Sequence, residues 1–596
     1  MDVSCVMPSM ERTITMTVLY ESVPIGYVDR LLDKTKPCFV DFETLGLYGD
    51  IVLAQFLQDD WEEALLVEYP NRERLQALLQ DAWVVTHPIS YDMGTLEISP
   101  RKIDDLQYAC RTAYPLQDGY SLADSAPQFY IGISKKDMQK SFMQKRQAFT
   151  DEQLHYGALD VYALQWLWHR DDVQDVLHDN LAYLVDIKNQ GFALNFQHNG
   201  MPVIARKWKE ANKETEAERK GYQTELDGIL GTTNFNVKSW QQKQKMFPEL
   251  PTDPKTGKIP TGEPAFKRLY LESDAVGGVD GSRRQAYNLV MKTTKRRTEL
   301  QDLEKYRESY IPNEDPVRIR TFFNVAGAIT GRYTSKGGDR IGFTNIQNIG
   351  RHFKGIFGYE EGAGRSIVSA DYSTAELIAG CAIFKVPTMR DLIMEGIDLH
   401  KAMASEVTGK AVENITKEER QHAKAINFGY LFGMGIERFQ AYAYDVFGVK
   451  LTLNECKTYK ALYYTSHPAI ARYHKDMARS IKGSNFVVKT ALGRVTKPDR
   501  YSDALNIPVQ GTIAECTKMA INYLFEDYPK LMSKVMLVNM VHDSIAIDTP
   551  DEYIEEVSEA LTHTMKEAWK QISRSPLFHY HSLPMGVDID VGKEWC

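Results

Sequence analysis

Short apolar runs alternate with helical patterns between residues 31 and 170. Three runs have the length of strands and are rich in Val, Ile, Leu and Phe, namely 38–44, 51–57 and 83–86. The segments between them carry apolar residues at helical spacing. This alternation predicts an α/β unit built around a sheet.

The pattern changes after residue 170. Residues 171–310 are long, charged and mostly helical in pattern. Two later stretches have the apolar character of buried strands. The first, 366–371, leads into a helix, and the second, 535–547, is typical of a hairpin with His542 and Asp543 at its turn. The chain is therefore predicted to be a multidomain α/β protein.

Composition is that of a globular protein and excludes several classes. The 596 residues are 43% hydrophobic and 25% charged, which excludes a disordered chain. No apolar run is long enough to span a bilayer, and the first thirty residues show no signal or transit peptide. Seven scattered cysteines without a CxxC pair argue for a reducing compartment and against a zinc site. We therefore expect a cytoplasmic protein.

The net charge is −9, which argues against a basic coat over the whole surface for nucleic acid. A local basic cleft is still compatible with this charge, because clustered metal-binding carboxylates make a protein acidic as a whole. Composition therefore does not decide whether the protein binds nucleic acid.

Acidic residues recur at element ends in the first unit. Asp41 and Glu43 are two apart on a predicted strand, so their side chains face the same side. Tyr156 and Asp160 are four apart on a predicted helix and share one face. With Asp92 after the third strand, these four carboxylates can hold two hard divalent cations, and the tyrosine hydroxyl can orient an attacking water. Each acid alone is more often a cap or a surface charge, but the set indicates a metal centre.

A second group of polar residues lies on a predicted helix. Arg420, Lys424 and Phe428 follow at i, i+4 and i+8, so two cations and a phenyl ring form a stripe about 12 Å long. Arg binds phosphate oxygens with a fork and Lys supplies a point charge, so the pair suits a triphosphate. Asp371 and Asp543, at strand ends, can converge on a metal pair. The alternative for the helix is a solvated basic face beside a core edge, and a lone Asp at a strand end is more often a turn residue.

The first set of motifs resembles the DEDDy class of 3′–5′ exonuclease domains, through Asp41-x-Glu43, Tyr91-Asp92 and Tyr156-x3-Asp160. The resemblance implies an RNase H-like domain in which Asp41, Glu43, Asp92 and Asp160 bind metal and Tyr156 orients the water. One departure is Pro88, where related chains often carry Asn. This departure puts a contact to single-stranded DNA in doubt.

Residues 31–596 as a whole resemble the family A DNA polymerases, the DNA polymerase I class. The motifs that carry the resemblance are Asp371-Tyr-Ser-x2-Glu376, Arg420-x3-Lys424-x3-Phe428, Val541-His-Asp543, Thr330-Gly-Arg332, Asn345-Ile-Gln347, Asp398-Leu-His400, Asn506-x3-Gln510 and the ending 584–595. The resemblance implies a right hand of palm, fingers and thumb that extends a primer by two-metal phosphoryl transfer, with proofreading, in DNA replication. It implies two Mg²⁺ ions per active site, for which Mn²⁺ can substitute, and primer–template DNA and dNTPs as partners.

The same resemblance assigns roles to individual residues. The implied metal ligands of the palm are Asp371, Asp543 and the Tyr372 carbonyl, and Lys424 is the implied proton donor to the leaving group. Contacts to the dNTP are implied for Tyr372, Glu376, His400, Arg420, Lys424 and Phe428, with Glu376 excluding ribonucleotides. Contacts to DNA are implied for Arg332, Asn345, Gln347, Asn506, Gln510 and His542.

The motifs also divide the chain into domains. The expected parts are an N-terminal extension 1–30, the exonuclease domain 31–175, a linker helix and thumb 176–310, the first part of the palm 311–395, the fingers 396–485, and the second part of the palm 486–596. We expect no 5′-nuclease domain before the exonuclease strand, and polymerases without this domain are found in phages and among some organellar or plasmid replicases. A bacteriophage replicase in the host cytoplasm is therefore expected, with replisome proteins such as a helicase–primase and a single-strand binding protein as partners and no membrane.

Four positions depart from the family pattern. Phe432 stands where Tyr is common, Ser544 where Glu is common, and Ile378 and Ser502 where Arg is common. Both metal aspartates are present, so catalysis is expected, and the departures concern primer contacts and sugar selectivity. One alternative is a single-subunit RNA polymerase, against which Glu376 and the exonuclease motifs argue. The other is a DNA-binding 3′–5′ exonuclease with an inactive polymerase half.

Overall fold

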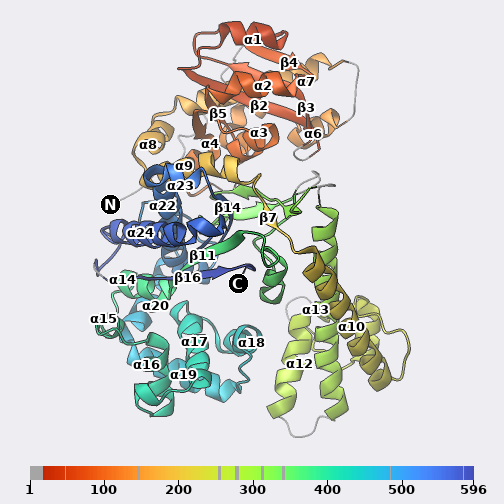
Figure 1. Cartoon of the computed structure of the whole chain (residues 1–596), viewed down its shortest axis with the longest axis vertical. Helices are drawn as coiled ribbons and strands as arrows, with labels where there is room; N and C mark the ends of the chain where they lie inside the picture. Colours follow the sequence, from red (N-terminus) through yellow and green to blue (C-terminus); the bar gives the residue numbers. More distant parts are fainter. Residues whose placement is uncertain are drawn as a thin grey trace.

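The computed structural model describes residues 18–46, 49–117, 119–143, 148–252, 257–275, 281–310, 314–337, 343–483, 485–581 and 583–595. An N-terminal α/β domain lies at one end of the molecule, a smaller sheet lies in the middle, and two helical arms extend from it at the other end (Figure 1). Residues 1–17 of the predicted N-terminal extension lie outside the described residues. None of the described helices is long and apolar enough to cross a membrane.

The N-terminal domain is built on a six-stranded sheet. Its strand order is β1 (Tyr20–Ser22), β4 (Ala64–Glu68), β3 (Asp50–Leu57), β2 (Pro37–Leu45), β5 (Trp83–Thr86) and β6 (Lys102–Asp105). The helices of this domain are α1 (Ile25–Leu31), α2 (Arg72–Gln80), α3 (Ile89–Leu96), α4 (Leu106–Ala113), α5 (Leu122–Ser125), α6 (Lys135–Phe142), α7 (Asp151–Trp168) and α8 (Asp171–Asp179). β2 pairs antiparallel with β3 and parallel with β5, so it lies inside the sheet and its apolar residues are buried.

The predicted boundary at residue 30 is wrong. β1 pairs in parallel with β4, and α1 contributes Ile25 and Val28 to the core beneath the sheet. Residues 20–31 therefore belong to the N-terminal domain. The strand is three residues long and too short for its apolar pattern to be recognised in the sequence.

A four-stranded antiparallel sheet forms the centre of the molecule and corresponds to the predicted palm. Its order is β14 (Met536–Val541), β15 (Ser544–Pro550), β11 (Arg365–Ser373) and β16 (Gly586–Gly592). One face is covered by α22 (Thr512–Asp527) and α24 (Ile554–Ile572), whose apolar stripes pack on it. Strands β14 and β15 are the predicted hairpin, and β11 is the predicted strand before a helix, α14 (Ala375–Ile383).

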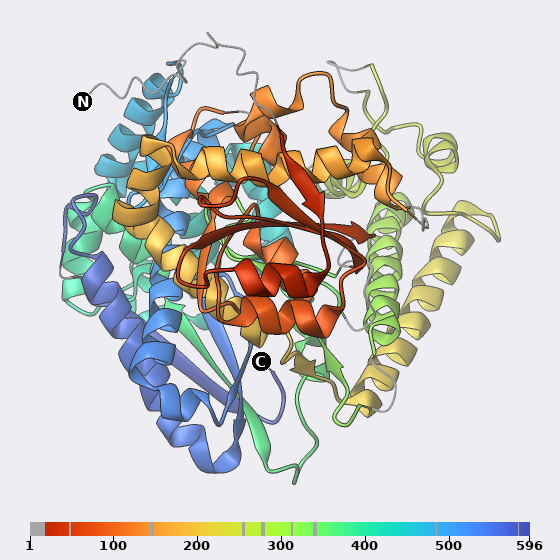
Figure 2. The ribbon, with the colours of Figure 1, turned by 90° about the horizontal axis from the view of Figure 1, so that it is seen from above.

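Two helical arms leave the palm sheet. One arm contains α10 (Ala205–Leu230), α11 (Trp240–Met246), α12 (Glu263–Ala275) and α13 (Gly281–Glu308), with α10 and α13 packed along each other. The other contains α15 (Pro387–Met394), α16 (Leu399–Thr408), α17 (Lys417–Leu431), α18 (Ile436–Phe447), α19 (Leu453–Ser466) and α20 (Pro468–Ser480). We call them the thumb arm and the fingers arm. Seen from above, the N-terminal domain covers the middle of the molecule and α10 and α13 lie to one side (Figure 2).

Short elements connect these parts. They are β7 (Met201–Pro202), β8 (Arg318–Ile319), β9 (Phe322–Asn324), β10 (Thr334–Lys336), β12 (Val488–Lys489), β13 (Val495–Thr496), α21 (Tyr501–Asn506), α23 (Pro529–Met532) and the short helical turns 127–130, 351–356, 412–414, 507–511 and 551–553.

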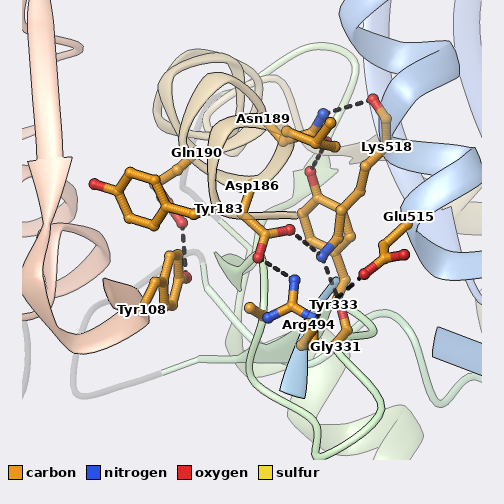
Figure 3. A network of polar contacts seen from close by, with 12 residues as sticks. Tyr108, Tyr183, Asp186, Asn189, Gln190, Gly331, Tyr333, Arg494, Glu515 and Lys518 are labelled. Atoms are coloured by element: carbon orange, nitrogen blue, oxygen red, sulfur yellow. Dashed lines mark hydrogen bonds and ion pairs between the residues drawn. The ribbon is translucent and has the colours of Figure 1, made fainter. Parts of the chain in front are cut away.

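Helix α9 (Leu181–Phe196) joins the N-terminal domain to the palm through a buried polar network (Figure 3). Asp186 of α9 accepts from Lys518 of α22 at 2.6 Å and forms an ion pair with Arg494. The ammonium of Lys518 also donates to the Gly331 carbonyl at 2.6 Å. These charged side chains are buried, so their mutual pairing satisfies groups that would otherwise be costly to remove from water.

Two candidate active sites

The first site lies where two strands of the palm sheet end. β11 and β15 pair with Asp371 opposite Ser544, and Asp543 occupies the tight turn between β14 and β15. His542 in the same turn has a φ of 61°, the left-handed conformation that a two-residue hairpin turn requires. The turn therefore brings Asp543 beside Asp371, as the sequence predicts.

The electrostatics of this pair fit a cation site. Burial raises the pKa of Asp543 to about 6, and the charge of Asp371 adds to the rise. Burial also raises the pKa of Asp371, while Lys354 lowers it. Two partly desolvated carboxylates that repel each other are stabilised by a divalent cation between them. The donor set therefore suits Mg²⁺ or Mn²⁺.

The side chain of Tyr372 points away from this site. Its side chain is buried on the opposite face of the sheet, and its hydroxyl donates to the Met565 carbonyl at 2.8 Å. The side chain is therefore a core residue, and only the carbonyl is left for the predicted metal contact.

Several charged groups near the pair lie outside the motifs named above. Asp588 of β16 lies opposite Asp371 in the antiparallel register, and it and Asp590 raise the pKa of Asp371. The alternation Val-Asp-Ile-Asp-Val was the available signal, because it places both acids on one face of a strand. The turn 351–356 adds two cations, since Lys354 lowers the pKa of Asp371 and Arg351 lowers that of Lys424.

Helix α17 carries the predicted stripe. It begins with a capping box between Thr416 and Glu419. Arg420 forms an ion pair with Asp398 at 2.8 Å, and burial, with help from Arg420, lowers the pKa of Lys424. A lysine with a lowered pKa gives up its proton more readily, which suits a proton donor.

His400 is buried against the stripe. The Asn427 amide nitrogen donates to the Leu399 carbonyl at 3.1 Å and lies 3.0 Å from His400 Nδ1, so Nδ1 is the acceptor and Nε2 carries the hydrogen. Burial lowers the pKa of His400 to about 4, and Nε2 has no hydrogen-bond partner among the described residues. The ring of Phe428 lies 5.6 Å from the imidazole. His400 is therefore a neutral donor whose Nε2–H has no acceptor in the described part of the chain.

Glu376 is held by two residues that were predicted to contact DNA. Arg332 Nη2 lies 3.1 Å from its carboxylate, and Gln510 Nε2 donates to the same oxygen at 3.0 Å. Phe432 has no hydroxyl to offer Glu376, and the described partners of this carboxylate are Arg332 and Gln510. Of the other departures, Ile378 is buried in α14, Ser502 lies near Asp503, and Ser544 lies opposite Asp371.

The remaining predicted DNA contacts lie on loops around the site. Asn345 bonds to Ser335 and to two main-chain amides of its own turn, and Gln347 donates to the Met540 carbonyl at 2.7 Å. Asn506 Oδ1 is buried without a partner among the described residues, and His542 is exposed at the hairpin turn. Their roles toward DNA stay predictions.

The second site lies in the N-terminal domain. Asp41 and Glu43 on β2 and Asp160 on α7 bring carboxylate oxygens within 4.8 Å of one another. These residues line a cavity of about 420 Å³ together with Tyr156. Three converging hard oxygen ligands fit a divalent cation. β2 and α7 therefore bring together three of the four predicted carboxylates.

Asp92 and Tyr156 complete the predicted set. Asp92 lies in the first turn of α3, outside the group of three, and burial raises its pKa to about 8 although Thr86 donates to it. The Tyr156 hydroxyl is buried without a hydrogen-bond partner among the described residues, and burial raises its pKa. An unpartnered hydroxyl beside clustered carboxylates can orient a water molecule.

Comparison with known proteins agrees with this geometry. A family model described as DNA polymerase family A matches residues 205–596. The chain is 28% identical over 595 residues to a DNA polymerase I of Aquifex aeolicus, covering 95% of this chain and 96% of the relative. It is 29% identical over 268 residues to a DNA polymerase of Bacillus phage SP01, covering 42% of this chain and 29% of the relative.

A solved structure has the same fold over nearly the whole chain. It is the POL domain of Pol1 from M. smegmatis in complex with DNA primer-template and dNTP. The TM-score is 0.72 at 18% identity, covering 97% of this chain and 99% of that chain. At this identity the likeness shows the fold alone.

Proposed function

The chain belongs to DNA polymerase family A, and from this premise we propose that it extends a DNA primer with dNTPs and removes mismatched 3′ ends in a second site. The observation that carries the proposal is the pair Asp371 and Asp543 at adjoining strand ends, with a cationic helix near by. Membership of the family makes the chain a DNA-directed DNA polymerase.

The proposed extension reaction depends on the carboxylate pair. Asp371, Asp543 and the Tyr372 carbonyl would hold two Mg²⁺ ions. These ions would activate the primer 3′-hydroxyl and neutralise charge on the triphosphate. Arg420 and Lys424 bind the phosphates, and the Nε2–H of His400 donates to a phosphate oxygen. The ammonium of Lys424 gives its proton to the departing pyrophosphate, which its lowered pKa supports.

Sugar selection is proposed for Glu376. A carboxylate held by Arg332 and Gln510 cannot move aside easily, so a ribose 2′-hydroxyl beside it would clash. This supports DNA synthesis over the alternative of a single-subunit RNA polymerase. Phe428 lies along the same stripe and is proposed to contact the base and sugar.

The proposed proofreading reaction is hydrolysis of the terminal phosphodiester bond. Asp41, Glu43, Asp92 and Asp160 would hold two Mg²⁺ ions, which would supply a nucleophilic hydroxide and stabilise charge on the phosphate. The Tyr156 hydroxyl orients the attacking water. The grouping of three carboxylates around a cavity supports this assignment.

The remaining proposals concern the setting of the enzyme. Similarity to the phage SP01 polymerase supports a role in phage DNA replication in the host cytoplasm, with primer–template DNA as the substrate. Helicase–primase and single-strand binding proteins are the corresponding proposed partners. Sequence similarity to polymerases of cellular bacteria equally fits a bacterial origin.

One experiment tests both sites. A 5′-labelled primer–template with a mismatched 3′ end is incubated with Mg²⁺, with and without dNTPs. The wild type should shorten the primer without dNTPs and extend it to full length with them. With extension measured on a primer whose 3′ end is matched, Asp543→Ala should abolish extension and keep trimming, and Asp41→Ala should do the reverse. Loss of both activities in either variant would contradict two separate sites, and trimming without extension by the wild type would favour an inactive polymerase half.

A further inference from the structure

The cavity of the proposed exonuclease site is completed by a residue from the polymerase half. All but one of its described lining residues lie between positions 41 and 160. The exception is Lys336, at the end of β10. It is also the only lysine or arginine among the described residues that line the cavity.

A small aromatic contact fixes β10 at this place. Lys336 pairs with Phe322 of β9, and Phe322 stacks on Phe343 with ring centroids 4.2 Å apart. Tyr91 of the N-terminal domain packs against these two rings and lines the same cavity. Its hydroxyl lies 2.5 Å from Thr44 Oγ1 on β2, beside Glu43. The strand that carries Lys336 is therefore docked on the wall of the cavity.

The charge of Lys336 is unusual for this wall. Asp41, Glu43 and Asp160 are acidic, and bound cations would use these carboxylates at the scissile phosphate. A single DNA strand that enters the cavity carries further phosphates besides the scissile one. A lysine can bind one of these phosphates, because its ammonium group is a compact point charge. Lys336 is exposed at the end of β10, and the loss of part of its surrounding water at the cavity wall lowers its pKa.

We propose that Lys336 binds a backbone phosphate of the single-stranded 3′ end in the exonuclease cavity, so that the polymerase half contributes directly to strand binding at the second site. This inference rests on the proposed exonuclease function. Pro88 stands where an Asn contact to the strand is common, and Lys336 supplies a contact to the strand from the opposite half of the chain.

The first test measures trimming of a single-stranded oligonucleotide by the full chain with Mg²⁺. Lys336→Ala should raise KM about tenfold, the usual effect of one lost charge-assisted contact, with kcat changed by less than about twofold. The salt dependence of log KM should become shallower by about 0.7, the value for one phosphate contact to a single strand. Lys336→Arg should restore most of the affinity. Lys530→Ala, which removes an exposed lysine on α23, is the matched control.

The second test does not depend on activity. Lysine acetylation followed by mass spectrometry is performed without divalent metal, with and without the oligonucleotide. Protection of Lys336 but not of Lys530 supports the proposal. Three results would overturn it. They are a KM for Lys336→Ala within twofold of the wild-type value, a loss in kcat alone for this variant, and a Lys336 that the oligonucleotide does not protect. If Asp41→Ala stops trimming while Lys336→Ala has no effect, only the role of Lys336 fails. Absence of trimming by the wild type overturns the exonuclease assignment and this role together.

Discussion

Lys267 of the thumb arm forms an ion pair with Asp445 of the fingers arm, so the two arms touch at a point away from the palm. The contact includes Tyr270 of α12 and Tyr444 of α18, whose ring centroids lie 5.7 Å apart. Both arms start from the palm, and the contact therefore closes a ring of protein. A duplex held between the arms would be enclosed.

We expect Lys267→Ala to shorten the product made in one binding event. Asp445 is 41% exposed, so the ion pair contributes at most about 1 kcal/mol to the contact between the arms. Its loss should therefore change the equilibrium constant between joined and separated arms by roughly fivefold. Primer extension in the presence of a DNA trap measures this length. Lys220→Ala is the control, because Lys220 is an exposed lysine of the thumb arm that pairs with Glu216 in the same helix. Equal product lengths for both variants would mean that the contact does not restrain DNA release.

The buried pair of Asp186 and Lys518 predicts a large effect on stability. Asp186→Ala leaves buried Lys518 without its carboxylate partner and leaves Arg494 only its longer contact to Glu515 at 3.7 Å, and such a loss typically costs about 3–5 kcal/mol. Unfolding of several domains is not a two-state process, so the midpoint of the first transition in calorimetry is the suitable measure.

The exposed pair of Arg479 and Asp476 provides the control for that measurement, since its loss should change stability by no more than about 0.5 kcal/mol. A shift for Asp186→Ala as small as that of Asp476→Ala would show that the network does not hold the N-terminal domain on the palm.

The contact between Gln510 and Glu376 predicts a change in sugar selectivity. Gln510→Leu leaves Glu376 with Arg332 as its remaining described partner, so the carboxylate is freer to move away from a ribose. One lost hydrogen bond is worth about 1 kcal/mol, and we expect ribonucleotide incorporation relative to deoxynucleotide incorporation to rise roughly fivefold. The ratio of kcat/KM values for the two nucleotides is measured, because it cancels any general loss of DNA binding.

Two variants bracket this result. Glu376→Ala should raise the ratio further, and Gln571→Leu on α24, whose amide bonds within its own helix, should leave it unchanged. A ratio for Gln510→Leu equal to that of the wild type would mean that Arg332 alone holds the carboxylate.

Much of each site could be predicted because its signals are local. The two-residue period of β2 places Asp41 and Glu43 on one face, and the hairpin pattern places Asp543 at a turn. The helical spacing of Arg420, Lys424 and Phe428 likewise depends only on neighbouring residues.

What could not be predicted depends on contacts between distant segments. β1, β4 and β6 are short strands whose register is set by their partners. Lys518 lies in a helix that is buried on most sides, where the apolar pattern gives no sign of its distant partner Asp186. Lys336 reaches the second site only because the two halves pack together, and no spacing in the sequence records that arrangement.

The two sites should respond differently to pH. Burial raises the pKa of Asp543 to about 6 and that of Asp92 to about 8. A raised pKa means that each carboxylate is protonated below that value, and a proton competes with a metal ion for it. The Mg²⁺ concentration for half-maximal extension should therefore fall as pH rises to about 6 and then level off. The corresponding concentration for trimming should keep falling up to about pH 8.

Stability without metal provides an independent check on Asp92. Its folded pKa lies above the ordinary value of 3.8, so the folded state binds the proton more tightly, and stability is lost as pH rises from about 4 to about 8. In EDTA, Asp92→Asn should melt at a higher temperature than the wild type at pH 9 and at nearly the same temperature at pH 4. The gain reflects removal of a buried charge and should be a few kcal/mol at most. Equal melting temperatures at pH 9 would show that Asp92 is ionised without cost, and the Mg²⁺ requirement for trimming should then no longer change between about pH 6 and pH 8.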